Sequence, residues 1–74
     1  MIITRLDDMK TAGIIRRLLN GESLTLGDEV YLNALYARMN KVNIAEELTP
    51  DNYHMYTDVL GKLTVIIILK ERLT

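Results

Sequence analysis

The sequence predicts an all-α fold, with one domain of three helices over residues 1–74. Apolar residues recur at spacings of three and four along most of the chain, as they do on one face of a helix. Two short stretches of helix-ending and helix-starting residues divide this pattern into three segments. The chain has 74 residues and no cysteine, so we expect one small domain without disulfides or thiolate metal sites.

The first predicted helix covers residues 8–19. Ile14, Ile15, Leu18 and Leu19 share one face at 100° per residue. Asn20-Gly21 follows directly, and glycine ends helices because it adopts the left-handed conformation without a Cβ clash. Residues 1–6, MIITRL, fit the apolar face poorly. They are predicted to form an extended arm or a short strand.

The second predicted helix covers residues 26–42. Thr25 and Asp28 resemble a capping box, with Asp in place of the usual Glu. An apolar stripe at spacings of three and four follows, formed by Leu32, Leu35, Tyr36, Met39 and Val42. The segment reads as an amphipathic helix that packs through this stripe.

The third predicted helix covers residues 50–72. Thr49 is a natural N-cap, and Pro50 suits the first helical position. Its broad apolar stripe is Tyr53, Tyr56, Val59, Leu60, Leu63, Ile66 and Ile67. Three further aliphatic residues, Val65, Ile68 and Leu69, project onto the face that water should cover.

An α+β fold is the alternative. Residues 64–69, TVIIIL, are rich in β-branched side chains and could form a buried strand paired with residues 1–6. Helical periodicity opposes this alternative, and a lone pair of strands is marginally stable in water. In the preferred helical fold, the predicted core consists of Ile14, Ile15, Leu18, Leu35, Met39, Leu60, Leu63 and Ile67.

The composition indicates a cytoplasmic protein without a membrane segment. The longest apolar run is Val65 to Leu69, far short of the roughly 20 residues that cross a bilayer as a helix. The first residues lack the basic start, the apolar stretch and the cleavage site of a signal peptide.

No catalytic residues, metal site or cofactor site are predicted. His54 is the only histidine, and a metal or nucleophilic site needs several converging groups. Glu46 and Glu47 are adjacent, so on a helix they point about 100° apart and cannot act as a paired acid and base. No glycine-rich phosphate motif occurs. The sequence therefore does not predict an enzyme.

The preferred prediction is a small protein-interaction module that forms a homodimer. An apolar fraction of 49% on so short a chain favours self-association. Val65, Ile68 and Leu69 are the predicted self-interface, and Tyr31 and His54 are the predicted contacts with another protein. By analogy of size and composition, an adaptor, regulator or inhibitor of the kind that phages and mobile elements carry fits this description.

The alternative function is a DNA-binding transcriptional regulator. Residues 44–62 resemble a helix-turn-helix, with a turn at Thr49-Pro50. The residues predicted to face the nucleic acid are Asn52, His54, Thr57, Arg16 and Arg17. Residues 21–60 carry seven acidic and two basic side chains. That acidity disfavours nucleic acid, because phosphate neutralisation dominates DNA affinity.

Overall fold

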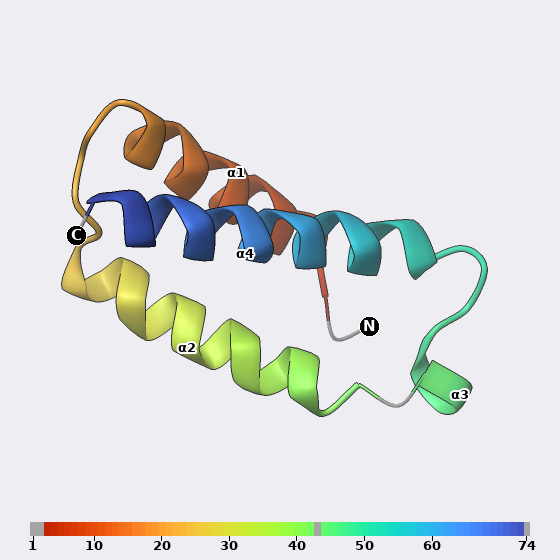
Figure 1. The fold of residues 1–74 in the computed structure, drawn as a ribbon. Coiled ribbons are helices and arrows are strands. Elements are labelled where there is room, and N and C mark those ends of the chain that lie inside the picture. The colour runs from red at the N-terminus through yellow and green to blue at the C-terminus, as the bar shows by residue number, and fades with distance from the viewer. Residues whose placement is uncertain (1–2, 43, 74) are drawn as a thin grey trace.

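The protein folds into three long helices and one short helical turn. The computed structural model describes residues 3–42 and 44–73, apart from the side chains of residues 44, 45 and 73. The elements are α1 (Arg5–Leu19), α2 (Leu26–Asn40), α3 (Ile44–Glu47) and α4 (Tyr53–Leu73). In Figure 1, α4 runs alongside α1 and α2, and α3 lies in the connection between α2 and α4.

This architecture confirms the all-α prediction. The described residues contain no strand, and residues 64–69 lie inside α4. The α+β alternative is therefore wrong. In this segment the helical spacing of the apolar residues outweighs the preference of β-branched residues for strands.

The first helix begins earlier than predicted, because Thr4 caps it. The Thr4 hydroxyl accepts a hydrogen bond from the Asp7 amide at 3.3 Å, and the Asp7 carboxylate accepts one from the Thr4 amide at 2.9 Å. This reciprocal capping box satisfies two amides that the helix leaves unpaired. Residues 5 and 6 are thus helical, contrary to the predicted arm. Residues 1 and 2 lie outside the described part of the chain.

The α1–α2 connection follows the predicted signals. Gly21 has a φ of 84°, the left-handed region that glycine tolerates. The Gly21 amide donates to the Leu18 carbonyl and the Glu22 amide donates to the Arg17 carbonyl, both at 3.0 Å. These two bonds form a Schellman motif that ends α1. Thr25 then caps α2 through the predicted capping box with Asp28.

The region between α2 and α4 differs from the prediction. Regular helix ends at Asn40, with Lys41 as the cap, and resumes as α4 only at Tyr53. Thr49 caps a turn that precedes α4 and not the first turn of the helix. The Thr49 amide donates to the Asn52 side-chain oxygen at 2.7 Å. Pro50 lies within this turn. The predicted helices 26–42 and 50–72 are therefore correct in type and too long by two and three residues at these ends.

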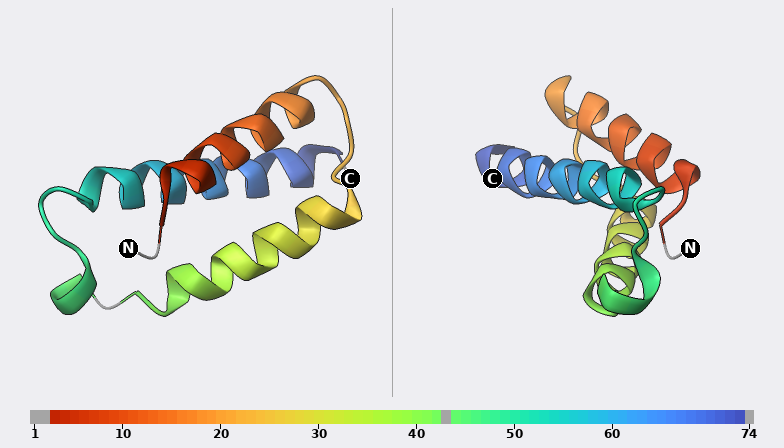
Figure 2. Two further views of the ribbon diagram at one scale, coloured as in Figure 1. Left: turned by 180° about the vertical axis from the view of Figure 1, so that it is seen from behind. Right: turned by 90° about the vertical axis from the view of Figure 1, so that its right-hand side faces the viewer.

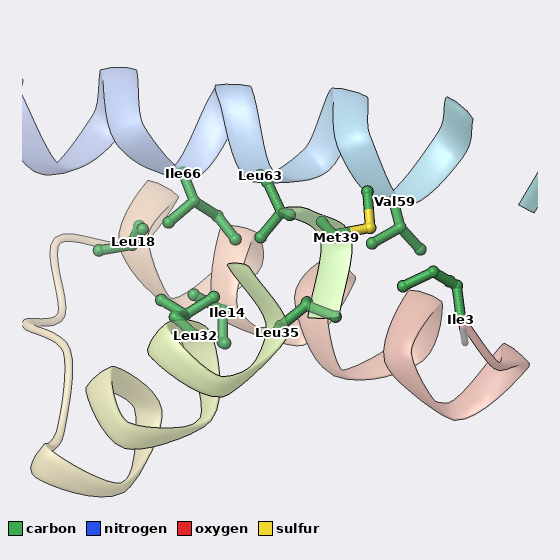
Figure 3. Close-up of a cluster of buried hydrophobic side chains, with 9 residues drawn as sticks. All are labelled: Ile3, Ile14, Leu18, Leu32, Leu35, Met39, Val59, Leu63 and Ile66. Atoms are coloured by element: carbon green, nitrogen blue, oxygen red, sulfur yellow. The ribbon is translucent and has the colours of Figure 1, made fainter. Parts of the chain in front are cut away.

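The core lies where the three long helices meet (Figure 3). Its members are Ile3, Ile14, Leu18, Leu32, Leu35, Met39, Val59, Leu63 and Ile66. α1 and α4 make the closest helix contact, and Figure 2 shows α1 on one side of α4 and α2 on another.

Two predicted core residues lie at the surface. Leu60 and Ile67 are exposed, and Ile15 is only partly buried. The predicted stripe on the third helix was wider than the sector that two neighbouring helices can cover. α4 is rotated so that Val59, Leu63 and Ile66 face inward, which leaves one flank of the stripe to solvent.

The molecule measures 38 × 19 × 18 Å along its principal axes. Within the described part of the chain, no helix is long and apolar enough to cross a membrane.

Candidate functional site

A buried carboxylate organises one end of the α1–α2 pair. Asp7 is 5% exposed. Its carboxylate accepts hydrogen bonds from the Tyr31 hydroxyl at 2.6 Å and from the Arg38 guanidinium at 2.9 and 3.3 Å. Burial raises the pKa of Asp7, but the bonds from Arg38, Tyr31 and Thr4 outweigh it and lower that pKa to about 2. Asp7 therefore stays ionised at neutral pH.

A second ion pair closes the opposite end of the same two helices. Both oxygens of Asp28 accept from the Arg17 guanidinium, at 2.6 and 2.7 Å. This bidentate hydrogen bond lowers the pKa of Asp28 to about 2, against the opposing effect of burial. Paired planar groups of this kind fix orientation as well as distance.

The two clamps are related by a constant offset in the sequence. The same spacing separates Thr4 from Thr25, Asp7 from Asp28 and Arg17 from Arg38. Each Asp caps the start of its own helix and binds an Arg near the end of the other helix. The ion pairs hold α1 and α2 together at both ends, so these charged residues serve the fold.

Tyr31, a predicted partner contact, is occupied within the molecule. Its hydroxyl binds Asp7, and the Lys10 ammonium lies 4.8 Å from its ring centroid. Burial and the neighbouring carboxylate raise the pKa of the Tyr31 hydroxyl. A shallow groove of about 320 Å³ runs past this ring, with Gly13 and Gly27 in its lining. Since Arg17 pairs with Asp28 here and Lys10 covers the ring, the cations of the groove are already engaged.

Among the residues that the structure describes, α4 exposes four aliphatic side chains. Leu60, Val65, Ile67 and Ile68 are 43%, 41%, 46% and 46% exposed, and we call them the α4 apolar surface. Leu69, which was predicted beside Val65 and Ile68, is partly buried against the core instead. Of the residues predicted for the self-interface, Val65 and Ile68 are therefore exposed and Leu69 is partly buried.

The other long helices expose apolar residues in smaller numbers. α1 exposes Leu6, Met9 and Leu19, and α2 exposes Leu26 and Val30. Single exposed apolar residues are common on soluble domains. Val30 is 62% exposed and lies on α2, so it provides a matched position for testing α4.

Lys62 on α4 forms a salt bridge with α1. Its ammonium contacts the Asp8 carboxylate at 2.5 Å, which ties α4 to α1. This bridge is compatible with the rotation of α4 that buries Val59, Leu63 and Ile66. His54 is exposed on α4.

Three of the residues predicted to face nucleic acid, Asn52, Thr57 and Arg17, have side chains that are bonded within the chain. The Asn52 side chain bonds the Thr49 amide and the Glu47 carbonyl, and the Thr57 hydroxyl donates to backbone carbonyls of its own helix. Arg17 pairs with Asp28, while Arg16 is exposed on α1. α3 is a single turn of four residues. The helix-turn-helix interpretation stays a prediction that this arrangement does not favour.

Sequence reasoning missed the Asp7–Tyr31–Arg38 network. The signal available was the capping-box spacing of Thr4 and Asp7, repeated at Thr25 and Asp28. An Arg at the matching place in each helix completes the repeat. Comparison of the chain with protein-family models, curated proteins and solved structures gave no match.

Proposed function

We propose that the protein is a non-enzymatic protein-interaction module that acts as a homo-oligomer through α4. The observation that carries this proposal is the α4 apolar surface, Leu60, Val65, Ile67 and Ile68. These four side chains lie within three turns of one helix, where water would otherwise cover them. Apolar area of this kind is stabilised by burial against a partner.

A module of this kind acts by what it covers or brings together. Pairing through α4 leaves the exposed surfaces of α1, α2 and α3 on the outside of the assembly. Those surfaces carry exposed charged side chains, including Arg16, Glu29 and Glu46. Charged surfaces give an assembly its specificity and its rate of encounter with a second macromolecule.

The test is the solution mass of wild type and of Ile68→Asp by light scattering after size exclusion. We expect wild type at about twice the mass of one chain at 100 μM. The substitution puts a charge into an apolar contact, at two places in a symmetric dimer, and desolvating an unpaired charge is costly. We therefore expect Ile68→Asp to weaken the dimer at least tenfold and to retain its helical circular dichroism, because Ile68 is exposed in the single chain.

Val30→Asp is the matched control. It places the same charge on an exposed aliphatic position of α2, and we expect it to remain a dimer. Wild type that runs as a monomer up to millimolar concentration would contradict the proposal. Dissociation by Val30→Asp with no effect of Ile68→Asp would move the interface to α2.

A further inference from the structure

One stripe of α4 combines exposed apolar residues with a charge of opposite sign at each end. Its members follow one another at spacings of three and four: Asp58, Gly61, Val65, Ile68 and Arg72. This spacing keeps them in one line along a helix. All five residues are exposed, and we call them the outer α4 stripe.

The charges of the stripe complement those of a second copy only when the two helices run antiparallel. Val65 is midway between Asp58 and Arg72 in the sequence. Across residues 3–42 and 44–73, no salt bridge involves either of these two charged side chains. A two-fold axis at Val65 would place Asp58 opposite the partner's Arg72, at both ends of the contact. A parallel pair would bring like charges together, which is unfavourable.

The side-chain sizes along the stripe are also compatible with an antiparallel pair. A Cβ placed on Gly61 would meet no atom within 4 Å, so this position leaves open space on the surface of α4. In the reversed arrangement Ile68 comes beside the partner's Gly61, and the missing side chain gives it room. Glycine at a helix contact lets a neighbouring side chain or backbone approach closely.

From these observations we propose that two copies of the chain pair antiparallel along the outer α4 stripe, with the two-fold axis at Val65. This inference rests on the proposed function and specifies the partner as a second copy in one register. The contact includes Val65 and Ile68 of the α4 apolar surface, whereas Leu60 and Ile67 lie on another face of α4, about 120° around the helix axis at 100° per residue. The contact is isologous, as a two-fold axis requires. The stripe is about 21 Å long at 1.5 Å per residue. A contact of that length buries less surface than a standard protein–protein interface, so we expect a dissociation constant in the micromolar range.

Single cysteines test the register, because the natural chain has none. A disulfide forms only where two Cα atoms come within about 7 Å. A residue on a two-fold axis meets its own copy, so Val65→Cys should crosslink to itself under mild oxidation at 100 μM. Val30→Cys on α2 measures the background from random collisions, and we expect at least tenfold less dimer from it.

A mixing experiment tests the direction. Asp58→Cys and Arg72→Cys should each give little disulfide dimer alone. An equal mixture should give the mixed dimer in at least tenfold excess over either homodimer, as identified by intact mass. One salt bridge survives in the mixed pair, because each variant keeps the charged residue that its partner lacks.

Each other outcome overturns the inference in a distinct way. Strong homodimers from Asp58→Cys and Arg72→Cys would mean a parallel pair. Light scattering that shows a dimer, with Val65→Cys and the mixture of Asp58→Cys and Arg72→Cys both at the background of Val30→Cys, would reject this register and leave the proposed function standing. Light scattering that shows only monomer would reject the register and the proposed function together.

Discussion

At the scale of single residues, the main feature is an ionised carboxylate inside a very small core. Asp7 is held by Tyr31, Arg38 and the amide of Thr4. Among the described residues, no buried side-chain nitrogen or oxygen lacks a hydrogen-bond partner. A buried charge is tolerated when its hydrogen bonds are complete, and removing one partner is costly because the other charge stays behind. The network therefore ties the start of α1 to α2 in one arrangement.

Asp7 and Asp28 make stability depend on acid pH. The pKa of each falls from 3.8 to about 2 on folding, so the folded state binds a proton less readily than the unfolded state. Their contribution is complete above about pH 5 and is lost as pH falls through 4 towards 2. One pKa unit corresponds to about 1.4 kcal/mol, which gives on the order of 2 kcal/mol for Asp7. Urea unfolding between pH 7 and pH 2, at fixed chain concentration, measures this loss.

Asp7→Asn separates the contribution of Asp7 from that of Asp28. It should cost about 2 kcal/mol at pH 7, because the neutral amide loses the charge that the bonds from Arg38 and Tyr31 stabilise. It should also flatten the fall in stability below pH 5. Asp51→Asn is the control, since Asp51 is exposed, and it should reproduce the wild-type curve. A variant at Asp7 with the full acid dependence of wild type would show that other carboxylates cause it.

At the scale of helices, local signals fixed more of the structure than long-range ones. Gly21 and the Thr25–Asp28 box could be read because each acts within a few residues. The rotation of α4 could not be predicted in this way. The apolar residues from Val65 to Leu69 surround the helix, so their spacing does not single out one face. The choice depends on contacts between distant residues, such as Lys62 with Asp8.

The same limit explains the candidate site. Val65 and Ile68 were predicted to lie outside because they broke the pattern, and they are exposed. Leu69 broke it equally and packs against the core. Tyr31 lies at the margin of the apolar face of its helix, and for this reason it was predicted to contact another protein. Its hydroxyl donates to Asp7 and the Lys10 ammonium lies over its ring, and pattern analysis within one helix has no access to such contacts.

Adjacent isoleucines on α4 should differ sharply in what they contribute. Ile66 is fully buried and Ile67 is about half exposed. Ile66→Ala removes buried methyl groups and leaves a cavity, so we expect a loss of about 2–5 kcal/mol. Ile67→Ala makes the same chemical change at the surface of the chain and should cost about 1 kcal/mol or less. Urea unfolding of both variants in the Ile68→Asp background compares them without association, and equal losses would mean that α4 is rotated differently.

At the scale of the whole molecule, the chain exposes more surface than its size requires. A compact monomer of 8.5 kDa exposes about 4,700 Å² by the usual scaling, and this chain exposes 5123 Å². A chain of this length buries a smaller share of its surface on folding than a larger domain does, so its own core leaves little stability in reserve. Covering the α4 apolar surface with a second copy reduces the exposed area and adds stability through mass action.

Folding and association should therefore be coupled, and the melting temperature should depend on chain concentration. Dimerisation stabilises the folded state in proportion to the logarithm of the concentration. With an unfolding enthalpy of about 0.7 kcal/mol per residue, a dimer of this size should gain about 5 °C for each tenfold increase. Circular dichroism melts of wild type from 5 to 500 μM measure this slope, while Ile68→Asp should melt at one temperature throughout. A wild-type melting temperature that stays constant across that range would mean that the single chain alone accounts for its stability.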